Sequence, residues 1–141
     1  MNDENDKGLD VKLKQQEEQI AFDVMTNFVE SGYSQWFMNL DYKRKDVEAD
    51  ELDIIEMSFE EFDEGTMQPL LDDKGNRHVF TITPEKVIAA MQQISNGNVE
   101  ISPTIQARIH ESLVDRDYAN MDAETDDCIV QVACFGTLVY G

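Results

Sequence analysis

A run of acidic residues in the middle of the chain limits both how this sequence can fold and what it can bind. Between residues 46 and 73 there are twelve Asp and Glu residues and no Lys or Arg, in a chain of 141 residues with a formal net charge of −19. Holding that charge in one compact domain costs stability through self-repulsion, most severely at low salt. The acidic run consists of Asp46, Glu48, Asp50, Glu51, Asp53, Glu56, Glu60, Glu61, Asp63, Glu64, Asp72 and Asp73.

The rest of the composition is that of a folded protein. Apolar residues make up 41% of the chain, with seven Phe, four Tyr, seven Met and one Trp, whereas a disordered acidic segment is poor in such residues. A length of 141 residues predicts one domain. We therefore expect a flexible polar tail at residues 1–8 and a single α+β domain at residues 9–141.

Hydrophobic periodicity predicts an N-terminal helix over residues 9–31. Its apolar stripe consists of Ile20, Val24, Met25, Phe28 and Val29, which recur at helical spacing. Gly32 follows at the position where a glycine commonly ends a helix.

The next part of the chain has the features of a small antiparallel sheet. Aromatic and alternating residues predict strands over 33–42, where Trp36, Met38 and Leu40 would share one face, and over 52–59. Two further segments, 66–71 and 78–83, flank a glycine-containing turn and predict a hairpin.

Three later helices are marked by their first and last residues. Thr83 before a proline predicts an N-cap, and Ser102 before a proline repeats that arrangement. Asp122 is the expected N-cap of the last and most apolar helix, and Gly136 is its expected C-terminal stop. One helix, three to four strands and about three further helices together predict an α+β fold.

Sequence motifs of known catalytic sites are missing. There is no nucleophile elbow, P-loop, dinucleotide-binding glycine motif or zinc-protease motif. Cys128 and Cys134 lie on different sides of one expected helix and are interpreted as small buried hydrophobes. His78 and His110 have neither a nucleophile nor a ligand set near them in the sequence. We therefore predict no enzyme activity, no cofactor and no metal site.

Trp36 and Phe37 have two interpretations. Aromatic residues next to a glycine can form an exposed anchor that supplies binding energy at an interface. More often such residues belong to the core, and that interpretation is favoured here.

Two stretches of the chain resemble a family of small tailed-phage proteins. The first is the segment 23–32, DVMTNFVESG, followed by YSQWF at 33–37, and the second is DDCIVQVACFG at 126–136, closed by Tyr140 and Gly141. The resemblance covers both ends of the chain and fits the hairpin and helix between them, but not the acidic run. It implies a phage accessory protein and transfers no catalytic residue.

Charge and resemblance together predict a function. The net charge is similar to that of antirestriction and anti-CRISPR proteins that imitate DNA. We expect an inhibitor that acts in the host cytoplasm, away from membranes and without contacting nucleic acid. Its partner would be a basic, nucleic-acid-binding host defence protein, such as a CRISPR effector or restriction enzyme, which the acidic run would bind in place of nucleic acid.

Other interpretations of the sequence stay open. One is a non-catalytic phage structural or regulatory module that binds a protein through the region of Trp36 and Phe37, or forms a homodimer through the apolar C-terminal segment. Another is a protein that acts on a small anionic ligand, which would require Arg77, Arg108 and Arg116 to converge. A solvated acidic surface and adaptation to high salt are the remaining explanations of the charge.

Overall fold

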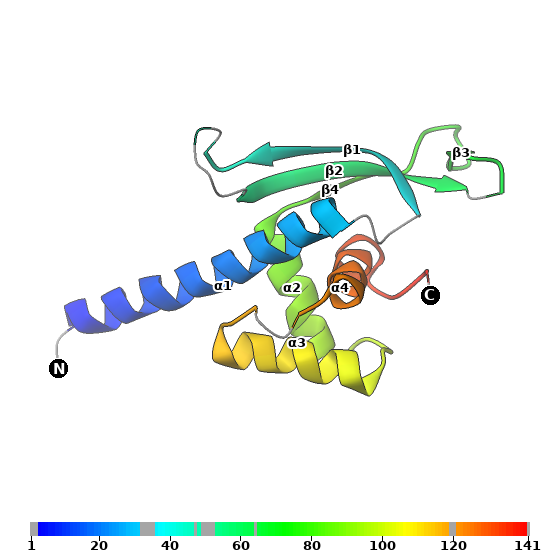
Figure 1. Ribbon diagram of the computed structural model, residues 1–141. Coiled ribbons are helices and arrows are strands. Elements are labelled where there is room, and N and C mark those ends of the chain that lie inside the picture. Colours follow the sequence, from blue (N-terminus) through cyan, green and yellow to red (C-terminus); the bar gives the residue numbers. More distant parts are fainter. Residues whose placement is uncertain are drawn as a thin grey trace.

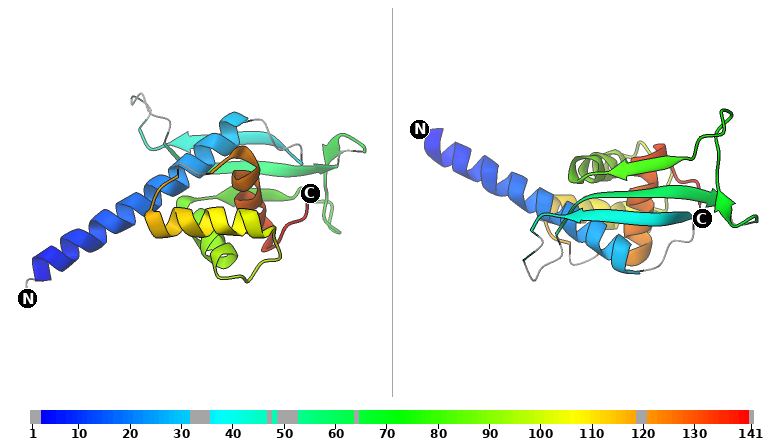
Figure 2. Two further views of the ribbon diagram at one scale, coloured as in Figure 1. Left: turned by 60° about the horizontal axis from the view of Figure 1, so that its bottom comes forward. Right: turned by 90° about the horizontal axis from the view of Figure 1, so that it is seen from above.

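The computed structural model describes residues 3–31, 36–46, 48, 53–63, 65–118 and 121–140, and these residues form two layers (Figure 1). One layer is a four-stranded antiparallel sheet, and the helices all lie on one side of it (Figures 1 and 2). The predicted α+β fold is confirmed. In chain order the elements are α1 (Asp3–Ser31), β1 (Phe37–Arg44), β2 (Ile54–Asp63), β3 (Gln68–Pro69), β4 (Val79–Ile82), α2 (Pro84–Ser95), α3 (Pro103–Asp115) and α4 (Ala123–Phe135).

Strand β2 is the centre of the sheet and pairs with all three other strands. β1 pairs along one edge of β2, and on the other edge β4 pairs with residues 57–60 and β3 with residues 62–63. The predicted hairpin is therefore correct around its turn, where the two arms share a bridge between Leu71 and Arg77 and backbone hydrogen bonds on either side of it. Farther from the turn, both arms pair with β2 instead of with each other. With ten residues, β2 is long enough to hold two short strands end to end along the same edge.

Strand β1 departs from the predicted alternation. The register with β2 shifts between Met38 and Asp41, and Asn39 in that interval has a φ of 57°. Such a bulge changes the face to which the following side chains point. Trp36, Met38 and Leu40 therefore do not line one face in the simple order that the sequence predicts.

Helix α1 joins the core through the predicted apolar stripe. Ile20 is 2% exposed, and Val24 and Met25 are fully buried. The helix begins at Asp3, so residues 3–8 are helical, whereas the sequence predicts a polar tail there. Acidic residues are favoured at a helix N-terminus, and one internal glycine costs only about 1 kcal/mol. Figure 1 shows the N-terminal part of α1 extending beyond the rest of the molecule.

The later helices begin and end close to the predicted residues. The Thr83 hydroxyl accepts a hydrogen bond from the Lys86 N–H, and an Asp122 carboxylate oxygen accepts one from Thr125. Gly136 ends α4 with a φ of 76°. Ser102 is the N-cap residue of α3, followed by a proline, as predicted, although its side chain makes no capping hydrogen bond. Proline in the first turn already supplies a helical φ without needing a partner for an N–H.

The core lies between the two layers. Met57 and Phe59 of β2 contribute from the sheet, and Met91 of α2 and Ile129 of α4 from the helices, each 1% exposed or less. The opposite face of the sheet has no helix over it in the part of the chain that the structure describes (Figure 2). The sheet that carries part of the acidic run thus has one uncovered face, and its other face packs against the buried core.

Candidate functional site

The acidic run occupies two faces of β2. Glu56 and Glu60 are partly exposed, whereas the intervening Met57 and Phe59 are buried against the helices. Lys43 Nζ lies 2.9 Å from a Glu56 oxygen, and an Arg77 nitrogen lies 3.2 Å from a Glu60 oxygen. The middle of the strand is therefore neutralised by ion pairs rather than left as bare negative charge.

The two ends of the sheet carry the exposed members of the acidic run. Asp46 and Glu48, which follow β1 in the connection to β2, form what we term the hairpin-end cluster. Asp63, Asp72 and Asp73 form the loop-end cluster, next to β3. Among the described residues, no Lys, Arg or His forms an ion pair with these five carboxylates. Asp53 is partly exposed, and Asp50, Glu51 and Glu64 lie outside the described residues.

Local turns hold three of these carboxylates in place. Asp46 accepts a hydrogen bond from the Glu48 N–H at 3.0 Å, and Asp63 accepts one from the Gly65 N–H at 2.8 Å. Asp72 accepts two, from the N–H groups of residues 74 and 76, both at 2.9 Å. The Asn76 N–H above all keeps the pKa of Asp72 below its ordinary value. The carboxylates are thus fixed in position, and Asp72 stays ionised in mildly acidic solution.

Glu61 is the member of the acidic run that points into the molecule. It is 7% exposed and lies 3.0 Å from His78 Nδ1, and its other oxygen accepts a hydrogen bond from the Tyr140 hydroxyl. Tyr140 also stacks on Trp36, with ring centroids 5.4 Å apart. Glu61 therefore fastens the C-terminal segment to the sheet and is not available to a partner.

Trp36 is a core residue, so its role as an exposed aromatic anchor is ruled out. It is 4% exposed, and its indole N–H donates to Asp127 at 2.9 Å. Phe37 is partly buried and stacks on Phe28, with centroids 4.9 Å apart. The favoured interpretation of the sequence is confirmed for Trp36, because an aromatic cluster between the layers encloses its ring.

Two buried aspartates on α4 were not predicted as functional residues from the sequence. Asp127 accepts the Trp36 indole N–H and, through its other oxygen, the Gln131 amide at 2.8 Å. Gln131 in turn accepts hydrogen bonds from the backbone N–H groups of Val139 and Tyr140. This network joins β1, α4 and the C-terminal segment. The signal in the sequence was a pair of adjacent aspartates inside the most apolar helix.

Asp126 is the more strongly perturbed of the two. It is fully buried, and one of its oxygens accepts hydrogen bonds from Asn27 and from the Tyr118 hydroxyl, each at 2.5 Å. Burial raises the pKa of Asp126 to about 7, and this effect outweighs the two hydrogen bonds. Burial and the neighbouring Asp126 also raise the pKa of Tyr118. The other oxygen of Asp126 has no hydrogen-bond partner among the described residues, so no donor at that oxygen stabilises the charged form of the carboxyl group.

The remaining reactive side chains are occupied or inert. Cys128 and Cys134 are free, and burial raises the pKa of their thiols to about 11 and about 12, so both stay protonated. Arg77 and Arg108 are held in separate ion pairs, the latter with Asp122 at 2.9 Å. In the described segments, no group of three or more His, Cys, Asp or Glu side chains is placed to hold a metal ion.

Comparison with known proteins does not assign the chain to a family. No protein-family model, curated protein or solved structure matches it. Among the helices that the structure describes, none combines the length and apolar character needed to cross a membrane.

Proposed function

We propose that this protein is a non-catalytic inhibitor that binds a basic, nucleic-acid-binding protein in place of its nucleic acid. The observation that carries the proposal is the pair of exposed acidic clusters at the two ends of the sheet. Their carboxylates have no cationic partner among the described residues, and they lie on a scaffold with a buried core. The net charge of −19 supplies a long-range field that attracts basic surfaces.

The spacing of the clusters supports a partner that grips a duplex. The hairpin-end cluster and the loop-end cluster lie at opposite ends of β2, which at about 3.3 Å per residue spans roughly 30 Å. One turn of B-DNA is about 34 Å long. A basic channel that contacts phosphates one turn apart would therefore meet both clusters. The ion-paired glutamates between them would contribute less to binding.

Preorganisation supports the same conclusion. The hydrogen bonds from backbone N–H groups hold Asp46, Asp63 and Asp72 before any partner arrives. Binding then costs less side-chain entropy than it would with freely rotating carboxylates. Together with the phage-protein resemblance, this leads us to propose a host defence complex, a CRISPR effector or restriction enzyme, as the partner.

A matched pair of charge variants tests the proposal. The test variant combines Asp46→Asn, Glu48→Gln, Asp72→Asn and Asp73→Asn, because Asn keeps the oxygen that accepts the turn hydrogen bonds. The control combines Glu100→Gln, Glu111→Gln, Asp115→Asn and Glu124→Gln, four exposed acids outside the acidic run. Both variants lose the same formal charge, so a difference between them reports position rather than net charge.

The measurement is displacement of fluorescent duplex DNA from a panel of purified CRISPR effectors and restriction enzymes. We expect the native protein to displace DNA from at least one of them. The test variant should be weaker by about tenfold, the control should lose far less, and all affinities should fall steeply with salt. Equal losses in the two variants, or no displacement from any enzyme, would contradict the proposal.

A second candidate is the non-catalytic protein-interaction module, which one observation favours. Met67, Leu71 and Val79, at the loop end of the sheet, are 65%, 55% and 57% exposed. Exposed apolar side chains at one end of an uncovered sheet suit a protein contact that does not depend on charge. Binding that survives molar salt and is lost in Leu71→Ser combined with Val79→Ser would identify this function instead.

A further inference from the structure

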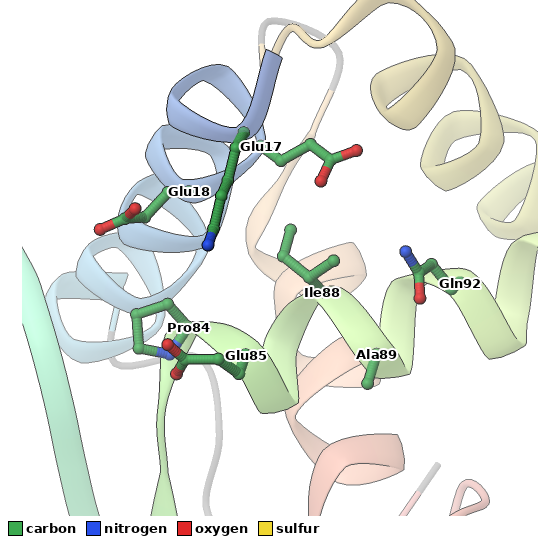
Figure 3. A pocket seen from close by; sticks show the side chains of 8 residues that line it. Glu17, Glu18, Pro84, Glu85, Ile88, Ala89 and Gln92 are labelled. Atoms are coloured by element: carbon green, nitrogen blue, oxygen red, sulfur yellow. The ribbon is translucent and has the colours of Figure 1, made fainter. Parts of the chain in front are cut away.

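A groove between α1 and α2 is a second feature that fits a basic partner (Figure 3). It has a volume of about 240 Å³, and its apolar residues are Pro84, Ile88 and Ala89 of α2. Its charged lining includes Glu17 and Glu18 of α1 and Glu85 of α2. Figure 3 shows Ile88 projecting from α2 toward the side of α1 that carries Glu17.

The groove exists because the two helices diverge. The C-terminal half of α1 is packed into the core through its apolar stripe, whereas most side chains from residue 11 to 19 are exposed. α2 is anchored by Val87, Met91 and Ile94, which are fully buried, and this leaves Ile88 half-buried and Ala89 exposed. The apolar surface of Ile88 thus remains open between two helices that are each held from elsewhere.

The size of the groove decides what kind of ligand it suits. Sites for cofactors and drug-sized molecules typically have volumes of about 300–1,000 Å³ and enclose most of the ligand. At about 240 Å³, the groove is smaller than that range. It is suited to one or two apolar side chains of a larger partner, which is the way an amphipathic helix docks on another protein.

The charge of the groove decides the character of that partner. Three carboxylates line it, and Lys14 is the cation among its lining residues. An apolar side chain flanked by acidic groups would be repelled by these carboxylates, whereas one flanked by Lys or Arg would be attracted. We propose that this groove docks a cationic amphipathic segment of the partner, with an apolar side chain against Ile88 and Ala89 and Lys or Arg residues beside Glu17, Glu18 and Glu85.

This inference rests on the proposed function for the basic character of the partner, and it adds a contact on the helix layer. The two parts of the interaction differ in physical kind. The end clusters supply charge alone, and the groove adds burial of apolar surface, which is less sensitive to salt. A partner that uses both would stay bound in salt concentrations that weaken the contacts of the end clusters.

The experiment uses a synthetic peptide of about 15 residues, long enough to form a helix, composed of Leu and Lys in amphipathic order. A second peptide carries Glu in place of each Lys. Binding of each fluorescent peptide to the full chain is followed by anisotropy. Ala89→Lys places a long cation in the groove, and Ala107→Lys makes the same substitution at an exposed alanine of α3.

We expect the Leu/Lys peptide to bind and the Leu/Glu peptide not to bind. Ala89→Lys should weaken binding about tenfold and Ala107→Lys less than about twofold, because both change the net charge equally but only the first obstructs the groove. Circular dichroism checks that both variants remain folded. Equal weakening by the two variants, or no binding of the Leu/Lys peptide, would overturn the inference.

Two further outcomes separate this inference from the proposed function. If the test variant of the proposed function, with Asp46, Glu48, Asp72 and Asp73 neutralised, loses DNA displacement but keeps peptide binding, the two sites are independent and both proposals stand. If sedimentation shows that the native chain dimerises and that Ala89→Lys prevents it, the occupant is a second copy of this chain, and the basic-partner docking site is wrong.

Discussion

The aspartates of α4 and those of the loop after β3 carry the same functional group in opposite surroundings. Asp126 and Asp127 lie in the core, where their oxygens are enclosed by protein, whereas Asp72 and Asp73 stand in solvent. Burial raises the pKa of Asp126 to about 7, and backbone N–H groups lower that of Asp72. A carboxylate in this protein is thus either a structural acceptor or a surface charge, according to what surrounds it.

The carboxylates that stabilise the fold and those that give the surface its negative charge lie in different parts of the molecule. The buried pair organises hydrogen bonds between α1, β1, α4 and the C-terminal segment. Asp72 accepts hydrogen bonds from backbone N–H groups of its own turn, and neither exposed aspartate forms an ion pair among the described residues. The surface charge can therefore change without loss of the fold, and the substitutions below test that separation.

The largest effect is expected for Asp127→Ala. The substitution removes the carboxylate that accepts the Trp36 indole N–H and one Gln131 N–H, and it creates a cavity, so we expect the free energy of unfolding to fall by about 4 kcal/mol. Denaturant unfolding measures the loss. Fluorescence of Trp36, the sole tryptophan, should change as well, since its hydrogen bond is removed. A loss of less than about 1 kcal/mol, roughly the effect of one hydrogen bond, would contradict the role of Asp127 as the acceptor that organises this part of the core.

An effect of at most similar size, with a definite pH dependence, is expected for Asp126→Asn. Because the pKa of Asp126 is raised in the folded state, that state binds the extra proton between about pH 4 and pH 7. This group therefore contributes stability at acidic pH that is lost as the pH rises to about 7. Asn is neutral at every pH and keeps an oxygen for Asn27 and Tyr118, so the variant should lack this decline.

At pH 8 we expect Asp126→Asn to be more stable than the native protein by up to about 4 kcal/mol, since each of about three pKa units is worth about 1.4 kcal/mol, with the two nearly equal at pH 4. Chemical denaturation at several pH values supplies the measurement. Parallel stability curves for the two proteins would show that Asp126 does not titrate in this range.

The smallest effect is expected for Asp73→Ala, the exposed counterpart of Asp127→Ala. Asp73 is solvent-exposed, so its removal should change the free energy of unfolding by less than about 0.5 kcal/mol. The same denaturant titration gives the value. A loss above about 1 kcal/mol would show that the surface and buried carboxylates are not energetically separate.

Local signals in the sequence predicted the helices well. The stripe from Ile20 to Phe28, the Thr83 and Asp122 caps and the Gly136 stop are all where the sequence predicts them. Each depends on residues within one or two helical turns of one another, so a single segment contains the information. The resemblance to phage proteins and the function inferred from it remain predictions.

The sheet was less predictable because strand pairing joins distant residues. The hairpin signal at 72–76 was real, but the placement of β4 and β3 end to end along the same edge of β2 depends on how long β2 is. The division of the acidic run into exposed, ion-paired and buried residues also depends on pairing between residues far apart in the sequence. The direction of Glu61, and the ion pairs of Glu56 and Glu60, follow from register and from neighbours far along the chain.

The amino-acid sequence by itself determined the net charge, the fold class and the positions at which most helices begin and end, since these depend on composition and on neighbours within a few residues. Only the tertiary structure decided which carboxylates face solvent, which are ion-paired and which are buried. The physical reason is that the state of a carboxylate is set by what surrounds it in space. For Asp126, Asp127 and Glu61 those surroundings come from segments remote in the chain.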